Sequence, residues 1–186
     1  MSDIKYISNR ISFTRKNGHL SVVIAATVSR TRESLLVAWL AGWTFCGAYF
    51  IYALFGDLPR EHKLFIAVLL SFWLYYEYRI GKMVLWRKFG YESLRIQEGK
   101  MILREVIKGM GKPKEYLLGN IRSFGVLPIE NGWMKTMDQS FWVMGTGRLQ
   151  FEYLGKLICF GRQLTDEEIK RLQLLLGDEI KKEQRR

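Results

Sequence analysis

The sequence predicts an α+β membrane protein, in which a two-helix transmembrane hairpin is followed by an antiparallel β domain closed by a C-terminal amphipathic helix. Three observations support this fold class. An uncharged apolar run is followed, after a short polar link, by a second apolar run. Short alternating apolar and polar segments separated by glycines come next. The chain then ends on a segment whose apolar residues recur at helical spacing.

The first expected helix covers residues 34–55, which are 22 residues without a charge. A helix of that length rises about 33 Å, enough to cross a hydrocarbon core of about 30 Å. A core helix of a large soluble protein is the alternative. The rest of the chain is too small to surround such a helix, so we expect residues 34–55 to span a membrane.

The second expected helix covers about residues 62–86 and has a shorter uncharged core. Leu64 to Tyr76 are uncharged over only 13 residues. The helical apolar pattern continues beyond them, and the side chains of Arg79 and Lys82 are long enough to reach lipid headgroups. The link between the helices is short and polar, with Pro59 expected in the first turn of the second helix. The two helices should therefore be antiparallel neighbours.

The charge distribution predicts the orientation. The chain has 29 Lys and Arg against 18 Asp and Glu, a net charge of +11. Residues 1–33 carry +4, the link at residues 56–63 carries no net charge, and the remaining +7 lies from Glu77 onward. Basic flanks stay on the cytoplasmic side. We expect a multi-pass protein of the bacterial cytoplasmic (inner) membrane with both termini in the cytoplasm, and no nucleic-acid partner.

Glu77 is the one acidic residue in the membrane-proximal part of the second helix. A charged group at depth in a bilayer is expensive and usually functional. From its neighbours in the sequence, however, Glu77 is expected near the cytoplasmic interface, in an ion pair with Arg79 or Lys82 at the level of the headgroups. A weaker alternative is an enzyme site at the membrane surface around Glu77 and Arg79.

Residues 91–186 are predicted to form the cytoplasmic β domain, with about seven strands. Turns are expected at Glu98-Gly99, Gly109-Met110-Gly111 and Leu154-Gly155-Lys156, and residues 133–144 are expected to form one long or two short strands. The N-terminal residues 1–33 contain another expected hairpin, on the same side of the membrane. They are therefore able to add strands to the same sheet.

The chain is expected to end in a helix that opens at Thr165. Thr165 with Glu168 three residues later is the signature of a capping box. Ile169, Leu172, Leu176 and Ile180 fall on one stripe, which we expect to pack against the β layer.

Seven antiparallel strands closed by one C-terminal helix are the outline of a pleckstrin-homology-like (PH-like) barrel or sandwich. The chain also resembles bacterial inner-membrane proteins in which a two-helix transmembrane hairpin precedes a PH-like domain. The resemblance lies in three segments, residues 85–92 (LWRKFGYE), 155–161 (GKLICFG) and 164–168 (LTDEE). These motifs are structural, so the resemblance implies a fold and supplies no functional residues.

No catalytic, cofactor or metal pattern is found in the sequence. Each Gly-Lys pair is followed by Met, Leu or Pro, so no phosphate-binding loop is present. The only histidines are His19 and His62, and the two cysteines, Cys46 and Cys159, lie in different predicted regions. We expect a protein that is not an enzyme and that needs no cofactor and no metal.

Two functions remain, and each has candidate residues. The preferred one is a non-enzymatic accessory or scaffolding subunit of a membrane protein complex. Small residues in the first helix allow close helix packing, and exposed aromatic or Met side chains could anchor a partner. The candidate partner contacts are Gly42, Gly47, Trp133 and Met134. The alternative is an anionic-lipid-binding or sensing module, with candidate headgroup contacts at Lys108, Lys112, Lys114, Arg79 and Lys82.

Overall fold

The computed structural model describes residues 4–16, 18–26, 30–128, 145 and 147–185, and it divides into two compact units. One unit, here called the β unit, combines Met1–Thr27 with Lys88–Arg186. The other, here called the hairpin, is Val28–Arg87. The expected strands at residues 133–144 lie outside the described residues.

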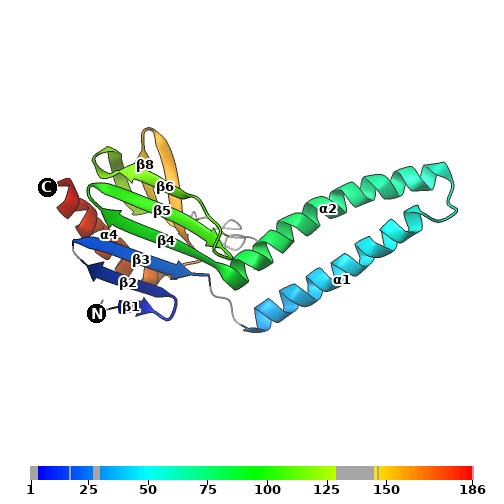
Figure 1. Cartoon of the computed structure of the whole chain (residues 1–186), viewed down its shortest axis with the longest axis horizontal. Helices are drawn as coiled ribbons and strands as arrows, with labels where there is room; N and C mark the ends of the chain where they lie inside the picture. The colour runs from blue at the N-terminus through cyan, green and yellow to red at the C-terminus, as the bar shows by residue number, and fades with distance from the viewer. Residues whose placement is uncertain (1–3, 17, 27–29, 129–144, 146, 186) are drawn as a thin grey trace. The chain divides into compact units, whose positions relative to one another are not determined.

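The first sheet of the β unit joins strands that come before and after the hairpin in the sequence (Figure 1). It has six antiparallel strands in sequence order, with β3 paired directly to β4. The backbone N–H of Ala26 donates to the carbonyl of Gly90 at 3.1 Å, one step beyond that pairing. The hairpin is therefore inserted between two neighbouring strands. The strands are β1 (Ile4–Ser8), β2 (Ile11–Lys16), β3 (His19–Ala25), β4 (Gly90–Gln97), β5 (Lys100–Ile107) and β6 (Pro113–Leu117).

The second sheet has three described strands, β7 (Ile121–Val126), β8 (Gly147–Tyr153) and β9 (Lys156–Arg162). A short 3₁₀ turn, η1 (Leu118–Asn120), leads from β6 to β7. The two sheets and the last helix enclose one apolar core, where the ring of Tyr116 lies 5.1 Å from that of Phe151. Among the described strands the sheets stay separate, so the expected closed barrel is not found: β6 passes to β7 through η1 without pairing with it.

Tight two-residue turns close several of the strand pairs. At three of them a non-glycine residue and the glycine after it both have positive φ, as hairpin turns of this length require. These pairs are Glu98-Gly99, Lys108-Gly109 and Leu154-Gly155. The first and third lie where the sequence predicts turns, whereas the second begins one residue before the predicted Gly109-Met110-Gly111.

The predicted C-terminal helix is confirmed as α4 (Asp166–Gln184). Thr165 accepts from the backbone N–H of Glu168, and the Glu168 carboxylate accepts from that of Thr165, which completes the capping box. The predicted stripe is buried in the core that α4 shares with both sheets: Ile169, Leu172, Leu176 and Ile180.

The hairpin contains α1 (Arg30–Leu54) and most of α2 (Arg60–Phe89). Both helices are long and apolar enough to cross a membrane, judged by length and composition. α1 begins four residues before the predicted start, and α2 begins two residues earlier and ends three later than predicted. Pro59 lies just before α2, and its carbonyl accepts from the N–H of Lys63 at 3.1 Å. The connection between the two helices is short, because α1 ends at Leu54 and α2 begins at Arg60.

Candidate functional site

Glu77 lies on the less exposed face of α2. Positions of reduced exposure recur there at alternating spacings of four and three residues: Ile66, Leu70, Trp73, Glu77 and Ile80. This spacing keeps side chains on one side of a helix, facing a neighbouring helix. Arg79, two residues beyond Glu77, projects from a different side and is exposed.

The carboxylate of Glu77 is bonded to α1 through Thr44. Thr44 Oγ1 lies 2.8 Å from Glu77 Oε1 and also 2.8 Å from the carbonyl oxygen of Leu40. A hydroxyl has one proton to donate, so the two acceptors share it. The other carboxylate oxygen, Glu77 Oε2, is buried and has no hydrogen-bond partner among the described residues.

This arrangement differs from the expected ion pair at the headgroups. Within the described part of the chain, neither Arg79 nor Lys82 pairs with Glu77, and Arg79 Nη1 donates instead to the Tyr75 hydroxyl at 3.2 Å. Residues two and five positions apart do not share a helix face, which explains the difference. Thr44 is the eleventh of the 22 uncharged residues 34–55, so Glu77 lies level with the middle of that run.

One turn away, Trp73 packs into the space left by Gly47. A Cβ atom at Gly47 would lie 2.0 Å from Trp73 Cε2, so only glycine fits beneath the ring. Trp73 Nε1 also donates to the carbonyl of Trp43 at 2.9 Å. Gly47 is therefore covered by Trp73 of its own hairpin, and its role as a partner contact stays a prediction. Gly42, with no atom within 4 Å of its Cβ position, remains open.

The candidate headgroup contacts separate into three groups. Lys108 and Lys112 lie in and beside the turn between β5 and β6, with Lys108 Nζ 5.2 Å from the centre of the Phe89 ring. Lys114 belongs to β6 itself, opposite Leu103. Arg79 and Lys82 are exposed on α2. The structure therefore brings together only Lys108 and Lys112 near one turn.

Two buried carboxylates of the β unit, Glu168 and Glu92, have shifted pKa values. Glu168 accepts from Ser8 Oγ at 2.7 Å and from Arg10 Nη2 at 2.5 Å, in addition to its capping bond to Thr165. Arg10 also donates to the carbonyl of Gln163. Burial alone would raise the pKa of Glu168, but these donors outweigh it and hold the pKa at about 2.

Glu92 has the opposite shift. It is almost fully buried and accepts from the backbone N–H of Gly161 at 2.6 Å, while Arg162 Nε lies 4.0 Å away. Burial raises the pKa of Glu92, and the Gly161 bond and the Arg162 charge only partly offset it. Arg162 Nη2 also donates to Glu105 at 2.9 Å, so the guanidinium is shared between two acids.

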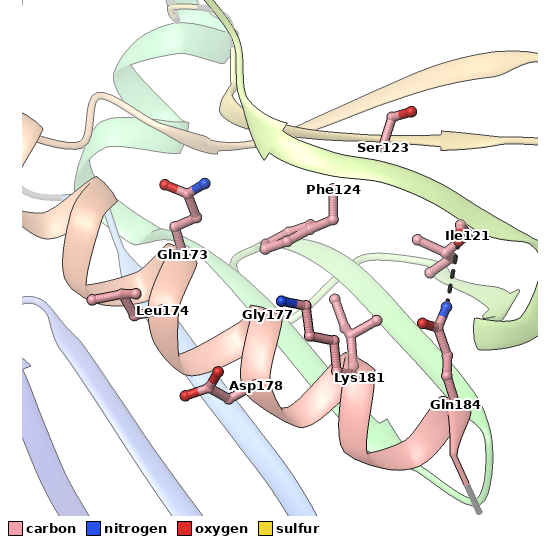
Figure 2. Close-up of a pocket in the computed structure, with 10 residues that line it drawn as sticks. Ile121, Ser123, Phe124, Gln173, Leu174, Gly177, Asp178, Lys181 and Gln184 are labelled. Atoms are coloured by element: carbon pink, nitrogen blue, oxygen red, sulfur yellow. Dashed lines mark hydrogen bonds between the residues drawn. The ribbon is translucent and has the colours of Figure 1, made fainter.

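A groove of about 390 Å³ runs between β7 and α4 (Figure 2). The ring of Phe124 is directed from β7 towards α4, where a Cβ atom at Gly177 would lie 3.8 Å from it, an ordinary van der Waals contact. Asp178 and Lys181 add one charge of each sign. Gln184 is already engaged, since its amide donates to the carbonyls of Leu118 and Ile121. The groove therefore has the size of a ligand site but no set of converging polar groups.

Sequence reasoning missed the Thr44–Glu77 contact, the partners of Glu92 and Glu168, and the groove. The helical spacing of Glu77 from Trp73 and Leu70 is a signal in the sequence that places Glu77 on the face towards α1, and so predicts a contact such as the one with Thr44. Trp133 and Met134, predicted as partner contacts, lie outside the described residues. Over the part of the chain that the structure describes, no group of three or more His, Cys, Asp and Glu side chains is placed to hold a metal ion.

Comparison with family models, with curated proteins and with solved structures finds no match to this chain.

Proposed function

We propose that this chain is a non-enzymatic accessory or scaffolding subunit of a protein complex in the bacterial cytoplasmic membrane, with both termini in the cytoplasm and the β unit PH-like. The observation that carries the proposal is Glu77, a carboxylate level with the middle of the apolar run of α1. Its one described partner is a shared hydroxyl. A polar group at that depth strongly favours a further hydrogen-bond partner. A helix of another subunit is able to supply it.

The exposed surface of the hairpin supports the same proposal. Only 11% of the apolar window in each helix is buried within the chain. Phe45, Tyr52 and Phe72 expose 77%, 79% and 64% of their surface, respectively. Lipid or the helices of another membrane protein would cover such side chains.

The pairing of β3 with β4 supports the proposed topology. These strands flank the hairpin and are hydrogen-bonded from Leu20↔Ile96 to Ala25↔Tyr91. For a hairpin that crosses a membrane, this pairing supports both of its ends lying on one side, and the positive-inside distribution favours the cytoplasm. Reporter fusions at the two termini test this, and a reporter active only outside the cytoplasm would contradict it.

The proposal is tested by affinity purification of the full chain from membranes in a mild detergent, followed by mass spectrometry. We expect membrane proteins that co-purify with the wild-type chain to be recovered severalfold less with Glu77→Ala, since polar contacts between membrane helices contribute about 1 kcal/mol. Ser71→Ala is the matched control, because the one bond of Ser71 among the described residues is to the carbonyl of Ala67 within its own helix. A strictly monomeric chain without partners would refute the proposal.

Glu77→Gln identifies the type of group that the partner offers. Glutamine keeps an oxygen for Thr44 and has nearly the same shape, but it has no charge. Recovery that survives this exchange indicates a neutral donor on the partner helix. Recovery lost with both Ala and Gln indicates a cationic side chain.

A further inference from the structure

The turn between β5 and β6, here called the Lys108 turn (residues 107–112), is rigidly built. Ile107 and Met110 exchange both backbone hydrogen bonds at 2.9 Å, and Lys108 and Gly109 between them have φ of 50° and 79°. This is the geometry of a two-residue hairpin turn that matches the twist of its strands. A short rigid turn presents its side chains at little entropic cost.

Two further contacts hold the Lys108 turn in place. Arg104 donates from Nε to the carbonyl of Gly111 at 2.9 Å and from Nη2 to that of Gly109 at 3.2 Å. Gly111 also approaches β5 so closely that a Cβ there would lie 1.9 Å from the carbonyl oxygen of Glu105. The turn is therefore fixed to its own strand.

The register of β4 and β5 places the Lys108 turn beside the last residue of α2. Ile107 pairs with Gly90, and Gly90 directly follows Phe89. Lys108 Nζ lies 5.2 Å and Lys88 Nζ 5.7 Å from the centre of the Phe89 ring. Distances of this kind are within the range of cation–π contacts. The turn is thus attached to the end of a helix whose apolar run is long enough to cross a membrane.

The side chains of the Lys108 turn combine apolar surface with positive charge. Met110 exposes 73% of its surface and Phe89 exposes 45%. Lys108 and Lys112 are exposed and have no ion pair among the described residues. Apolar side chains next to lysines at the end of a membrane helix are typical of the headgroup region of a bilayer.

We propose that the Lys108 turn is a second membrane contact of this chain and binds anionic phospholipid headgroups. Met110 enters the boundary between headgroups and acyl chains, and the ammonium groups of Lys108 and Lys112 bind lipid phosphates. This contact goes beyond the subunit role and requires only that the hairpin span the bilayer. It would hold the β unit against the membrane surface at a point fixed by Phe89.

The proposal is tested with the full chain in vesicles, using single cysteines that carry an environment-sensitive fluorophore. Met110→Cys reports on the turn. Glu98→Cys is the matched control, because Glu98-Gly99 is the same kind of turn at the opposite end of β4 and β5. Each of these two variants also carries Cys46→Ser and Cys159→Ser, so that its new cysteine is the one that is labelled. Native Cys46, exposed in α1, is labelled in Cys159→Ser alone and reports on the hairpin.

Quenching by spin-labelled lipids is compared in phosphatidylcholine vesicles with and without phosphatidylglycerol. We expect strong quenching at position 110 but not at position 98, increased by phosphatidylglycerol and reduced by salt. Each of Lys108→Gln and Lys112→Gln should lower the ratio of docked to undocked turn about fivefold. Lys100→Gln, which changes a lysine at the far end of β5, should leave the ratio unchanged.

The contrary outcomes are distinct. Quenching at position 46 without quenching at position 110 overturns the second membrane contact and leaves the subunit role intact. Quenching at position 110 that is equal in neutral and anionic vesicles overturns the binding of anionic headgroups. Absence of quenching at position 46 overturns both proposals, because the hairpin is then not in the bilayer.

Discussion

The two units of the chain differ in the hydrogen-bond partners of their carboxylates. In the β unit, Glu168 is surrounded by an arginine, a serine and a backbone N–H. In the hairpin, Glu77 has a shared hydroxyl on one oxygen and no described partner on the other. The β unit also encloses its own core, whereas the hairpin exposes large aromatic side chains. Glu168 therefore finds all its donors within the β unit, whereas Glu77 has an oxygen for which the described residues supply no donor.

Removing Arg10, the charge partner of Glu168, should cause the largest loss of stability. We expect Arg10→Ala to lower the free energy of unfolding of the β unit by about 3 kcal/mol, because a buried carboxylate then loses its charge partner. Hydrogen exchange of the full chain in detergent should show faster opening of β1, β2 and the start of α4. Lys100→Ala, which breaks the exposed pair with Glu115, should change little, and an equal loss in both variants would contradict this account.

Disturbing the contact of Trp73 with Gly47 should cause the next largest loss of stability. We expect Gly47→Ala to destabilise the hairpin by about 2 kcal/mol, since the added methyl group has to displace an aromatic ring. Thermal unfolding followed by tryptophan emission measures this, because Trp43 and Trp73 lie at the contact. Gly42→Ala adds the same methyl group where nothing lies within 4 Å, so a similar loss there would argue against the contact.

The two carboxylates of the β unit should respond to pH in opposite directions. Because the pKa of Glu168 falls from 4.5 to about 2 on folding, its contribution is present above pH 4.5 and decreases on acidification. We expect a loss of about 1 kcal/mol between about pH 5 and about pH 3, after allowance for solvent screening. The pKa of Glu92 is raised on folding, so its contribution is greatest below pH 4.5 and decreases as the pH rises.

Hydrogen exchange corrected for its intrinsic pH dependence measures both effects. On acidification, protection should decrease at the start of α4 and should not decrease at the amide of Gly161, which binds Glu92. Glu168→Gln should remove the acid-dependent loss. Parallel changes at the two sites in the wild-type chain would show that general charge repulsion dominates.

Removing the Thr44 hydroxyl should cause the smallest loss of stability. We expect Thr44→Val to destabilise the hairpin by about 0.6 kcal/mol, the average for a hydrogen bond between membrane helices. The measurement is again thermal unfolding by tryptophan emission, with Ser71→Ala as the variant that removes a hydroxyl bonded within one helix. A loss of several kcal/mol would mean that Glu77 has no other source of hydrogen bonds in the hairpin.

Features encoded in neighbouring residues were the easiest to predict. Thr165 and Glu168 lie within one turn of helix, and the buried stripe of α4 contrasts with its charged residues, so the capping box and the packed face could both be identified. Arg10 lies 158 residues from Glu168, and nothing in the local sequence indicates their pairing. The same is true of Glu92 and Gly161, which belong to different sheets.

The hairpin was predictable as a pair of helices but not as a contact surface. In a helix that is apolar on all sides, the residues facing a neighbour look like those facing lipid. The sequence neighbours Arg79 and Lys82 therefore predict the wrong direction for Glu77, which shares its face with Leu70 and Trp73. Gly42 and Gly47 also looked equivalent in the sequence, and only the position of Trp73 distinguishes them.

The insertion of the hairpin between β3 and β4 has a consequence for synthesis. The ribosome makes β1–β3 first. The pairing of β3 with β4, which includes Ala25 with Tyr91, can form only after the hairpin and β4 have been synthesised. Such long-range pairing is slow to form. A nascent chain that inserted one helix and not the other would leave β3 and β4 on opposite sides of the membrane, unable to pair. With the proposed membrane topology, the six-stranded sheet would therefore form only in chains in which both helices had been inserted.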